Sequence, residues 1–177
     1  MKKVWITSAL VLGVGTAAVL AGPDQEHMAA PVKSSAELEH IKNLAGRWEG
    51  TTQDGDGEPQ PAAVDYKVTS GGSAVVETLF PGTPHEMVSV YHDVNGKLAM
   101  THYCMLGNQP QLQLTGGDGQ HIELSFADSP GIDAAKDQHM HALTLAWADP
   151  DHLTQRWSCY QDGKFDRTTT IAVSRAH

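Results

Sequence analysis

Residues 87–105 read MVSVYHDVNGKLAMTHYCM and predict a β-hairpin. Two runs rich in β-branched and aromatic residues flank Asp93–Gly96, and its Asn-Gly pair is the strongest short hairpin signal. The same stretch carries the densest polar chemistry of the chain, in His92, His102, Tyr103 and Cys104. We therefore expect both the main sheet and the functional residues to be organised around this hairpin.

Strand patterns and turn signals alternate from Gly46 onward. The runs are separated by clusters of Gly, Asp, Asn and Pro, which are the usual turn residues. This pattern predicts ten strands near 46–52, 63–70, 73–80, 86–92, 97–105, 110–115, 121–127, 139–147, 153–160 and 165–174, with one longer loop at 130–138.

A single short helix is expected before the strands. Ser34–Glu37 fits a capping box, with a hydroxyl at the N-cap and a glutamate three residues later. Leu38, Ile41 and Leu44 then recur at helical spacing, which predicts a helix over 35–43. A helix this short is marginal alone, so it must pack on the sheet.

Apolar and polar residues alternate along the predicted strands. Val64, Tyr66 and Val68 share one face of their strand, for example, while polar residues share the other. A sheet of short antiparallel strands leaves two unpaired edges unless it closes on itself. The sequence therefore predicts an all-β fold: a closed antiparallel up-and-down β-barrel of 8–10 strands, with the short N-terminal helix plugging its base.

The first residues have the composition of a cleavable signal peptide. Lys2 and Lys3 precede an apolar run, and Val19–Ala21 suits a signal-peptidase site. We predict a signal peptide at 1–21, a flexible leader at 22–33 and one domain at 34–177. The protein is then periplasmic or secreted, with no stable membrane association after cleavage; the alternative is an uncleaved anchor.

The charge of the chain excludes some partners. Removing 21 of the 177 residues leaves 156, and the loss of two lysines takes the net charge from −9 to −11. An acidic chain without basic clusters is not suited to bind nucleic acid or anionic membranes. The sequence leaves the oligomeric state open.

Gly46-Arg47-Trp48-Glu49-Gly50 follows the predicted helix and opens the first strand. This arrangement resembles the calycin superfamily of lipocalins, fatty-acid-binding proteins and their bacterial relatives. The resemblance implies that Gly46 and Trp48 are structural, that Trp48 closes the base of the barrel, and that an arginine from the last strand packs over it. Arg175 or Arg167 is the expected arginine.

Two further runs are similar to a family of secreted bacterial lipocalin-like proteins of unknown function. They extend from Glu86 to His92 and from Thr101 to Pro110. The chain lacks the late T-D-Y signature of lipocalins. Haem-binding barrels that share G-x-W-x-G use a histidine near the C-terminus, where this chain offers only His177.

The expected function is the binding of a small apolar or amphipathic molecule inside the barrel. A barrel of this size has room for one small ligand, and no cofactor is expected. Histidine or amide groups would orient the polar head of the ligand and apolar side chains would enclose its body. The predicted lining and rim residues are Met87, Tyr91, His102, Tyr103, Asn108, Gln109 and Trp157.

Two alternatives remain at this stage: a metal or haem protein, and a ligand-free structural or accessory domain. The candidate metal ligands are His92, His102 and Cys104, with Met100 on the same strand face as the last two. Mixed imidazole, thiolate and thioether ligands suit copper or zinc. Weaker metal candidates are the His139/His141 pair and the acidic Asp54–Glu58 loop.

Cys104 and Cys159 are the two cysteines of the chain. In an oxidising compartment they form a candidate disulfide, and two buried free thiols are the alternative. The sequence contains no serine nucleophile elbow, phosphate loop or nucleotide fingerprint, so we expect binding and not catalysis. The alternative that the sequence leaves open is an enzyme in which Cys104 is the nucleophile and His102 the base.

Overall fold

The computed structural model describes residues 33–176. The predicted signal peptide and the leader up to residue 32 lie outside the described residues. One helix and ten strands follow in order: α1 (Ala36–Lys42), β1 (Gly46–Asp54), β2 (Gln60–Thr69), β3 (Ala74–Leu79), β4 (Met87–Val94), β5 (Lys97–Tyr103), β6 (Gln111–Gly117), β7 (His121–Phe126), β8 (His139–Asp149), β9 (His152–Gln161) and β10 (Lys164–Arg175). A single 3-10 turn, Ser70–Gly72, joins β2 to β3.

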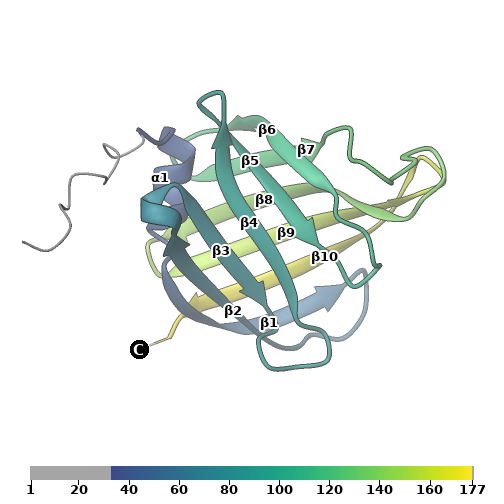
Figure 1. Ribbon diagram of the computed structural model, residues 1–177. Coiled ribbons are helices and arrows are strands. Elements are labelled where there is room, and N and C mark those ends of the chain that lie inside the picture. The colour runs from purple at the N-terminus through teal and green to yellow at the C-terminus, as the bar shows by residue number, and fades with distance from the viewer. Residues whose placement is uncertain (1–32, 177) are drawn as a thin grey trace, which may run out of the picture. The chain divides into compact units, whose positions relative to one another are not determined.

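The ten strands form one closed barrel in which sequence neighbours pair in antiparallel fashion (Figure 1). β1 closes the barrel by pairing with β10, where Trp48 lies opposite Arg175. The predicted all-β, up-and-down barrel with one short N-terminal helix is therefore confirmed. Among the described residues, no helix is long and apolar enough to cross a membrane.

The hairpin predicted from residues 87–105 is formed by β4 and β5. Val94 pairs with Lys97, which leaves Asn95 and Gly96 as a two-residue turn. Both have positive φ, 53° and 76°, the combination that favours Asn-Gly in tight hairpins. The turn thus fixes the register that later places Ser89 opposite His102.

The helix begins one residue later than the capping box predicts. Ser35, not Ser34, is the N-cap, and its Oγ accepts a hydrogen bond from the Leu38 N–H at 3.1 Å. Ser35 also donates from its N–H and its hydroxyl to the Asp93 carboxylate, at 2.6 and 2.7 Å. The long-range partner on the hairpin selects the cap, and the local pattern could not show it.

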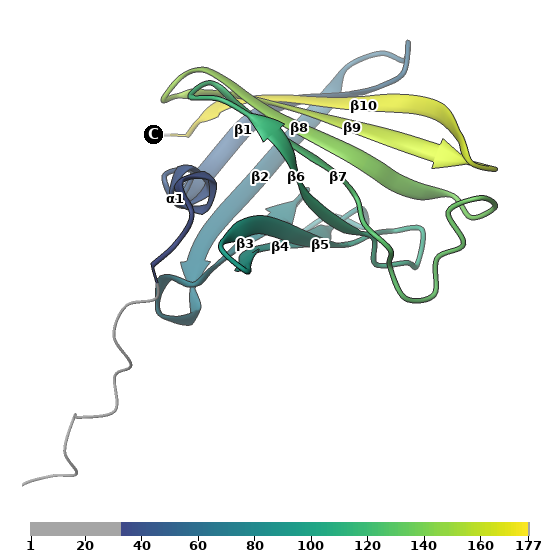
Figure 2. The ribbon, with the colours of Figure 1, turned by 90° about the horizontal axis from the view of Figure 1, so that it is seen from above.

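One end of the barrel is closed by α1 (Figure 2). Leu38, Ile41 and Leu44 are buried in the same core cluster as Trp48. The Trp48 indole N–H donates to the Leu44 carbonyl at 2.8 Å, and the Arg175 guanidinium lies 4.3 Å from the ring centroid. Of the two candidate arginines, Arg175 is the one beside the Trp48 ring, and Arg167 lies instead beside Asp54.

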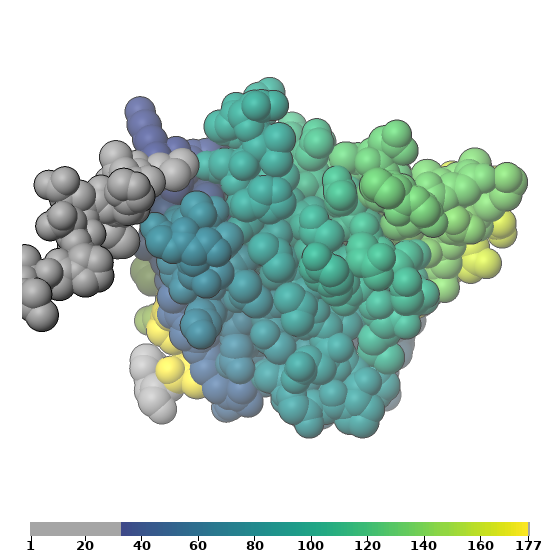
Figure 3. Space-filling view, in the orientation of Figure 1, coloured from purple at the N-terminus to yellow at the C-terminus, as the bar shows by residue number. Residues whose placement is uncertain are grey.

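Large side chains fill most of the barrel interior. Trp48, Tyr91, Leu79, Met100 and Leu145 are each at most 1% exposed, and they belong to one contiguous cluster. The outer wall formed by the teal residues is a continuous surface of side chains without a wide opening (Figure 3). The helix covers one end of the barrel, and we call the opposite end the open end.

Candidate ligand-binding site

A row of inward-facing polar residues crosses four neighbouring strands. Tyr66 on β2 lies opposite Glu77 on β3, Glu77 lies opposite Ser89 on β4, and Ser89 lies opposite His102 on β5. Glu77, Ser89 and His102 are each at most 1% exposed. Buried polar groups require partners, so this row must be satisfied within the barrel.

Hydrogen-bond donors converge on the Glu77 carboxylate. The Tyr66 and Tyr91 hydroxyls donate to it at 2.6 and 3.0 Å. The Gln155 amide, from β9 on the opposite wall, donates to Glu77 Oε1 at 2.6 Å and to the Tyr66 oxygen at 2.7 Å. The Trp157 indole N–H in turn donates to Gln155 Oε1 at 2.8 Å. The hydrogen bonds of the network therefore all lead to the Glu77 carboxyl group.

Burial raises the pKa of the Glu77 carboxyl, and hydrogen bonds from Tyr66, Ser89, Tyr91 and Gln155 act in the opposite direction. Burial and the nearby Glu77 charge also raise the pKa of both tyrosine hydroxyls well above its usual value. Within residues 33–176, no arginine or lysine forms an ion pair with Glu77. The network therefore holds a buried acid without a cationic partner.

His102 lies at the end of the row, against Trp157, with the two ring centroids 4.7 Å apart. Its Nδ1 lies 3.0 Å from Ser89 Oγ. Burial lowers the pKa of His102 to about 4, so the imidazole is neutral at pH 7. Because Ser89 is a donor toward Glu77, we assign the proton to His102 Nδ1, which leaves Nε2 as an unprotonated acceptor.

A small apolar cavity of about 80 Å³ lies against His102 at the open end. Its volume is well below the range of about 300–1,000 Å³ typical of drug-sized ligand sites. No carboxylate or cationic side chain lines it. The lining residues are Leu79, Phe80, Met87, His102, Met140, Trp157, Thr169 and Ile171.

Phe80 at the edge of this cavity has φ of 53°, in the left-handed region that a bulky residue rarely adopts. It directly follows β3, and its N–H donates to the Ala63 carbonyl at 2.9 Å. Such strain is often found at binding sites, where the surrounding structure holds it. The strained backbone turns the Phe80 ring against the core instead of into solvent.

Larger hollows lie on the outside of the protein. One of about 420 Å³ is an open groove along β1 and β2, beside Arg47 and Pro61. Another of about 330 Å³ lies at the helix end, between His40 and Trp147. Neither includes a buried polar group, so the smaller cavity at His102 is the better candidate site.

The structure brings together three of the seven predicted lining residues: Met87, His102 and Trp157. Tyr91 is buried deeper, and its hydroxyl is used by Glu77. Tyr103 is 51% exposed, because it follows the inward-facing His102 and so points outward. Gln109 is exposed and bonds weakly to the Gly107 carbonyl, at 3.4 Å.

Asn108 lies in the loop between β5 and β6, not in the cavity. Its amide donates to the Gln138 carbonyl at 2.7 Å and so ties this loop to the start of β8. Its Oδ1 is buried and is the one such side-chain atom without a hydrogen-bond partner in the described part of the chain. Its role is therefore to hold the loops of the open end together.

The predicted metal set of His92, His102 and Cys104 is not formed. His102 faces the interior, whereas His92 follows the inward-facing Tyr91 and points outward, and Cys104 lies beyond the end of β5. Residues 33–176 contain no group of three or more His, Cys, Asp or Glu side chains placed to hold a metal ion. Because side chains alternate between the two faces of a strand, residues that are close in the sequence can lie on opposite sides of the barrel wall.

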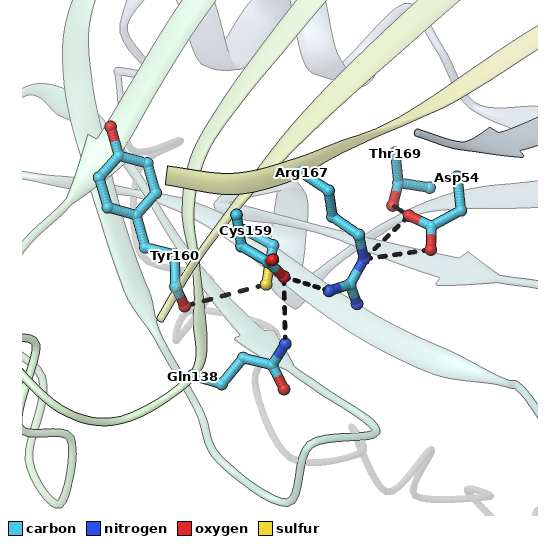
Figure 4. Close-up of polar contacts among 7 residues, drawn as sticks. Asp54, Gln138, Cys159, Tyr160, Arg167 and Thr169 are labelled. Atoms are coloured by element: carbon cyan, nitrogen blue, oxygen red, sulfur yellow. Dashed lines mark hydrogen bonds and ion pairs between the residues drawn. The ribbon is translucent and has the colours of Figure 1, made fainter. Parts of the chain in front are cut away.

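The weaker metal candidates also have other partners. His139 Nε2 and His141 Nδ1 lie 3.0 Å apart and are hydrogen-bonded, and both rings pack on Phe126. Asp54 is held by Arg167 and Thr169, which use its carboxylate oxygens (Figure 4).

Cys104 and Cys159 are free thiols in this structure, so the candidate disulfide is absent. Cys159 lies on β9 beside Arg167 (Figure 4), and Cys104 lies in the turn after β5 instead of mid-strand. Burial raises the pKa of both thiols, which keeps them protonated and weakly nucleophilic.

Sequence reasoning missed Glu77, Ser89, Gln155 and Met140. A signal was present for two of them, since Glu77 alternates with Val75 and Leu79, and Gln155 with Leu153 and Trp157. A polar residue on an apolar strand face indicates a buried network. Met140 could not be placed, because an irregularity between Met140 and Ala142 breaks the alternation of β8.

The sequence matches no family model and no curated protein. Among solved structures, a protein of unknown function of the DUF3598 family from Nostoc punctiforme has a TM-score of 0.52 and 15% identity. The match covers 77% of this chain and 49% of that one, so this chain spans about half of that protein.

Two β-barrels match less well. A redesigned barrel named b11L5F_LGL has a TM-score of 0.37 and 12% identity over 77% of this chain and 95% of its own. EF1p2_mFAP2b, solved bound to DFHBI, has a TM-score of 0.40 and 10% identity over 78% and 98%. At such identities the likeness concerns the fold alone, and the resemblance to secreted lipocalin-like proteins stays a prediction.

Proposed function

We propose that this chain is an exported, lipocalin-like barrel that binds a small, partly apolar molecule at its open end. The observation that supports this most directly is the apolar cavity of about 80 Å³ against the neutral, buried His102. A hydroxyl or N–H of the ligand would donate to His102 Nε2. Its apolar part would pack on Met87, Met140 and Ile171.

The cavity limits the ligand to a small molecule or to one end of a larger one. The two methionines at its wall are unbranched and flexible, so they can move to admit a larger apolar group. The buried network behind His102 fixes the imidazole, and a fixed polar group gives a small site its selectivity.

A titration with short-chain alcohols, observed by NMR, tests this binding. We expect saturable shifts of the Met87 and Met140 methyls and of the Trp157 indole N–H, with the affinity rising as the alkyl chain lengthens. Met140→Phe, which fills the cavity, should abolish the response, whereas Met105→Phe at an exposed turn should not. Non-saturable shifts, or equal responses of both variants, would contradict the proposal.

Export is tested separately by expressing the full chain in a bacterial host. Mass spectrometry of the periplasmic fraction should find a mature protein that begins at Gly22. Ala21→Phe places a large residue at the cleavage position and should leave the precursor unprocessed. An unprocessed wild-type chain in the cytoplasm would overturn this part of the proposal.

The dense packing of the interior favours a second candidate, a structural or accessory domain without a ligand. This function predicts no saturable response to any alcohol, in the wild type or in Met140→Phe. The alcohol titration of the wild type, Met140→Phe and Met105→Phe therefore distinguishes a ligand-binding barrel from a structural domain.

A further inference from the structure

The cavity at the open end is lined by one histidine and two methionines. His102 comes from β5, Met87 begins β4, and Met140 is the second residue of β8. No carboxylate, thiol or charged nitrogen shares the lining. Thioether sulfur is a soft ligand that selects Cu(I), while Mg²⁺, Ca²⁺ and Zn²⁺ prefer oxygen, nitrogen or thiolate.

The Nδ1 nitrogen of His102 is held by a serine hydroxyl, and this leaves Nε2 facing the cavity. Metal-binding histidines usually donate the other ring N–H to a carboxylate, a carbonyl or water, which fixes the ring and raises its basicity. Here Nδ1 contacts Ser89 at 3.0 Å, and Ser89 lies directly opposite the Glu77 carboxyl. Nε2 makes no hydrogen bond to any residue in the described range 33–176.

The charge balance of the interior also favours a monovalent cation. Glu77 is fully buried and has no cationic side chain beside it among residues 33–176. A cation on His102 would lie next to Ser89, which hydrogen-bonds toward Glu77. A divalent ion would have a much larger desolvation cost in an apolar cavity, since that cost rises with the square of the charge.

Trp157 adds an aromatic neighbour to the site. Its ring lies 4.7 Å from the His102 ring, and its indole N–H is already used by Gln155. Aromatic faces attract cations, and the attraction grows where water is excluded. The cavity is small, about 80 Å³, which is ample for one bare ion and restrictive for an organic ligand.

We propose that the open-end cavity binds one Cu(I) ion through His102 Nε2 and the thioether sulfurs of Met87 and Met140, with Trp157 beside the ion. The inference rests on the proposed function only in taking this cavity as the binding site, and it names a different class of ligand.

The test is an anaerobic competition between the purified chain and the Cu(I)–bicinchoninate complex. The two thiols are first removed with Cys104→Ser and Cys159→Ser, because cysteines also bind Cu(I). We expect one equivalent of Cu(I) to bind in this background and to quench Trp157 fluorescence, with no equivalent response to Zn(II).

The double variant Met87→Leu/Met140→Leu then tests the role of the two sulfur atoms without changing the apolar volume of the cavity. Leucine keeps the apolar volume and removes the sulfur, so Cu(I) affinity should fall about a hundredfold or more with an unchanged thermal midpoint. Met105→Leu, at the exposed turn, is the matched control. Full Cu(I) binding by the double variant, or loss of binding when the thiols are removed, would overturn the proposal.

The alcohol titration keeps the two proposals distinct. In Met87→Leu/Met140→Leu the Trp157 N–H still reports alcohol binding, and it should respond as in the wild type. A wild-type chain that binds Cu(I) but no alcohol would refute the organic ligand and leave the metal site standing. A wild-type chain that binds alcohol but no Cu(I) would refute the metal site and leave the organic ligand standing.

Discussion

Replacing Trp48 with alanine is expected to lower the free energy of unfolding by about 4 kcal/mol, the usual range for a fully buried tryptophan. Trp48 is 1% exposed and contacts Leu44, just after the helix, and Arg175 on the last strand. Its loss leaves a cavity, removes the hydrogen bond to the Leu44 carbonyl and takes away the surface on which Arg175 rests. Urea unfolding followed by circular dichroism measures the change.

Trp147→Ala is the matched control for this prediction. Trp147 is also at the helix end and its indole N–H donates to the Gly119 carbonyl at 3.0 Å, but it is only partly buried and stacks on His40. Replacing Trp147 with alanine should lower the free energy of unfolding by less than half as much as replacing Trp48. Equal costs for the two variants would show that Trp48 does not have the closing role that its contacts indicate.

Acidification from pH 6.5 to pH 4 is expected to remove about 3 kcal/mol of stability through His102 alone. The pKa of His102 is about 4 in the folded protein, against 6.5 for the ordinary residue. Between these values the unfolded chain binds a proton that the folded chain does not, so stability falls as the pH falls. The contribution is complete above pH 6.5 and is lost by pH 4.

The comparison of wild type with His102→Gln isolates this effect. Glu77 changes stability with the opposite sign, because its raised pKa makes the folded state bind a proton that the unfolded state has lost. That contribution is common to both proteins and largely cancels in the difference. A difference between the two unfolding free energies that does not vary with pH would contradict the buried, neutral His102.

Much of the fold could be predicted because local signals and the global structure agree. The Asn95–Gly96 turn fixes one hairpin, and the alternation of Val64, Tyr66 and their neighbours fixes which face is inside. The predictions fail where a residue distant in the sequence determines the local structure. Asp93 selects Ser35 as the helix cap, and no pattern within the helix could indicate this.

The site was predicted less well, since strand periodicity gives the face of a residue but not its depth. His102 and Trp157 line the cavity, whereas the Tyr91 hydroxyl is bound to Glu77 and Asn108 lies in a loop. Depth depends on strand stagger around the whole barrel, which only the full register shows. Tyr103 could have been excluded from the alternation alone.

The pairing of β1 with β10 has a consequence for how the chain folds. Arg175 bonds to the Ala45 carbonyl, a residue 130 positions earlier. Until the last strand has been synthesised, the first nine form only an open sheet whose two bare edges can pair with other molecules. Closure must also overcome the entropy of a loop that spans almost the whole domain, which makes slow folding and early self-association the characteristic risks of this topology.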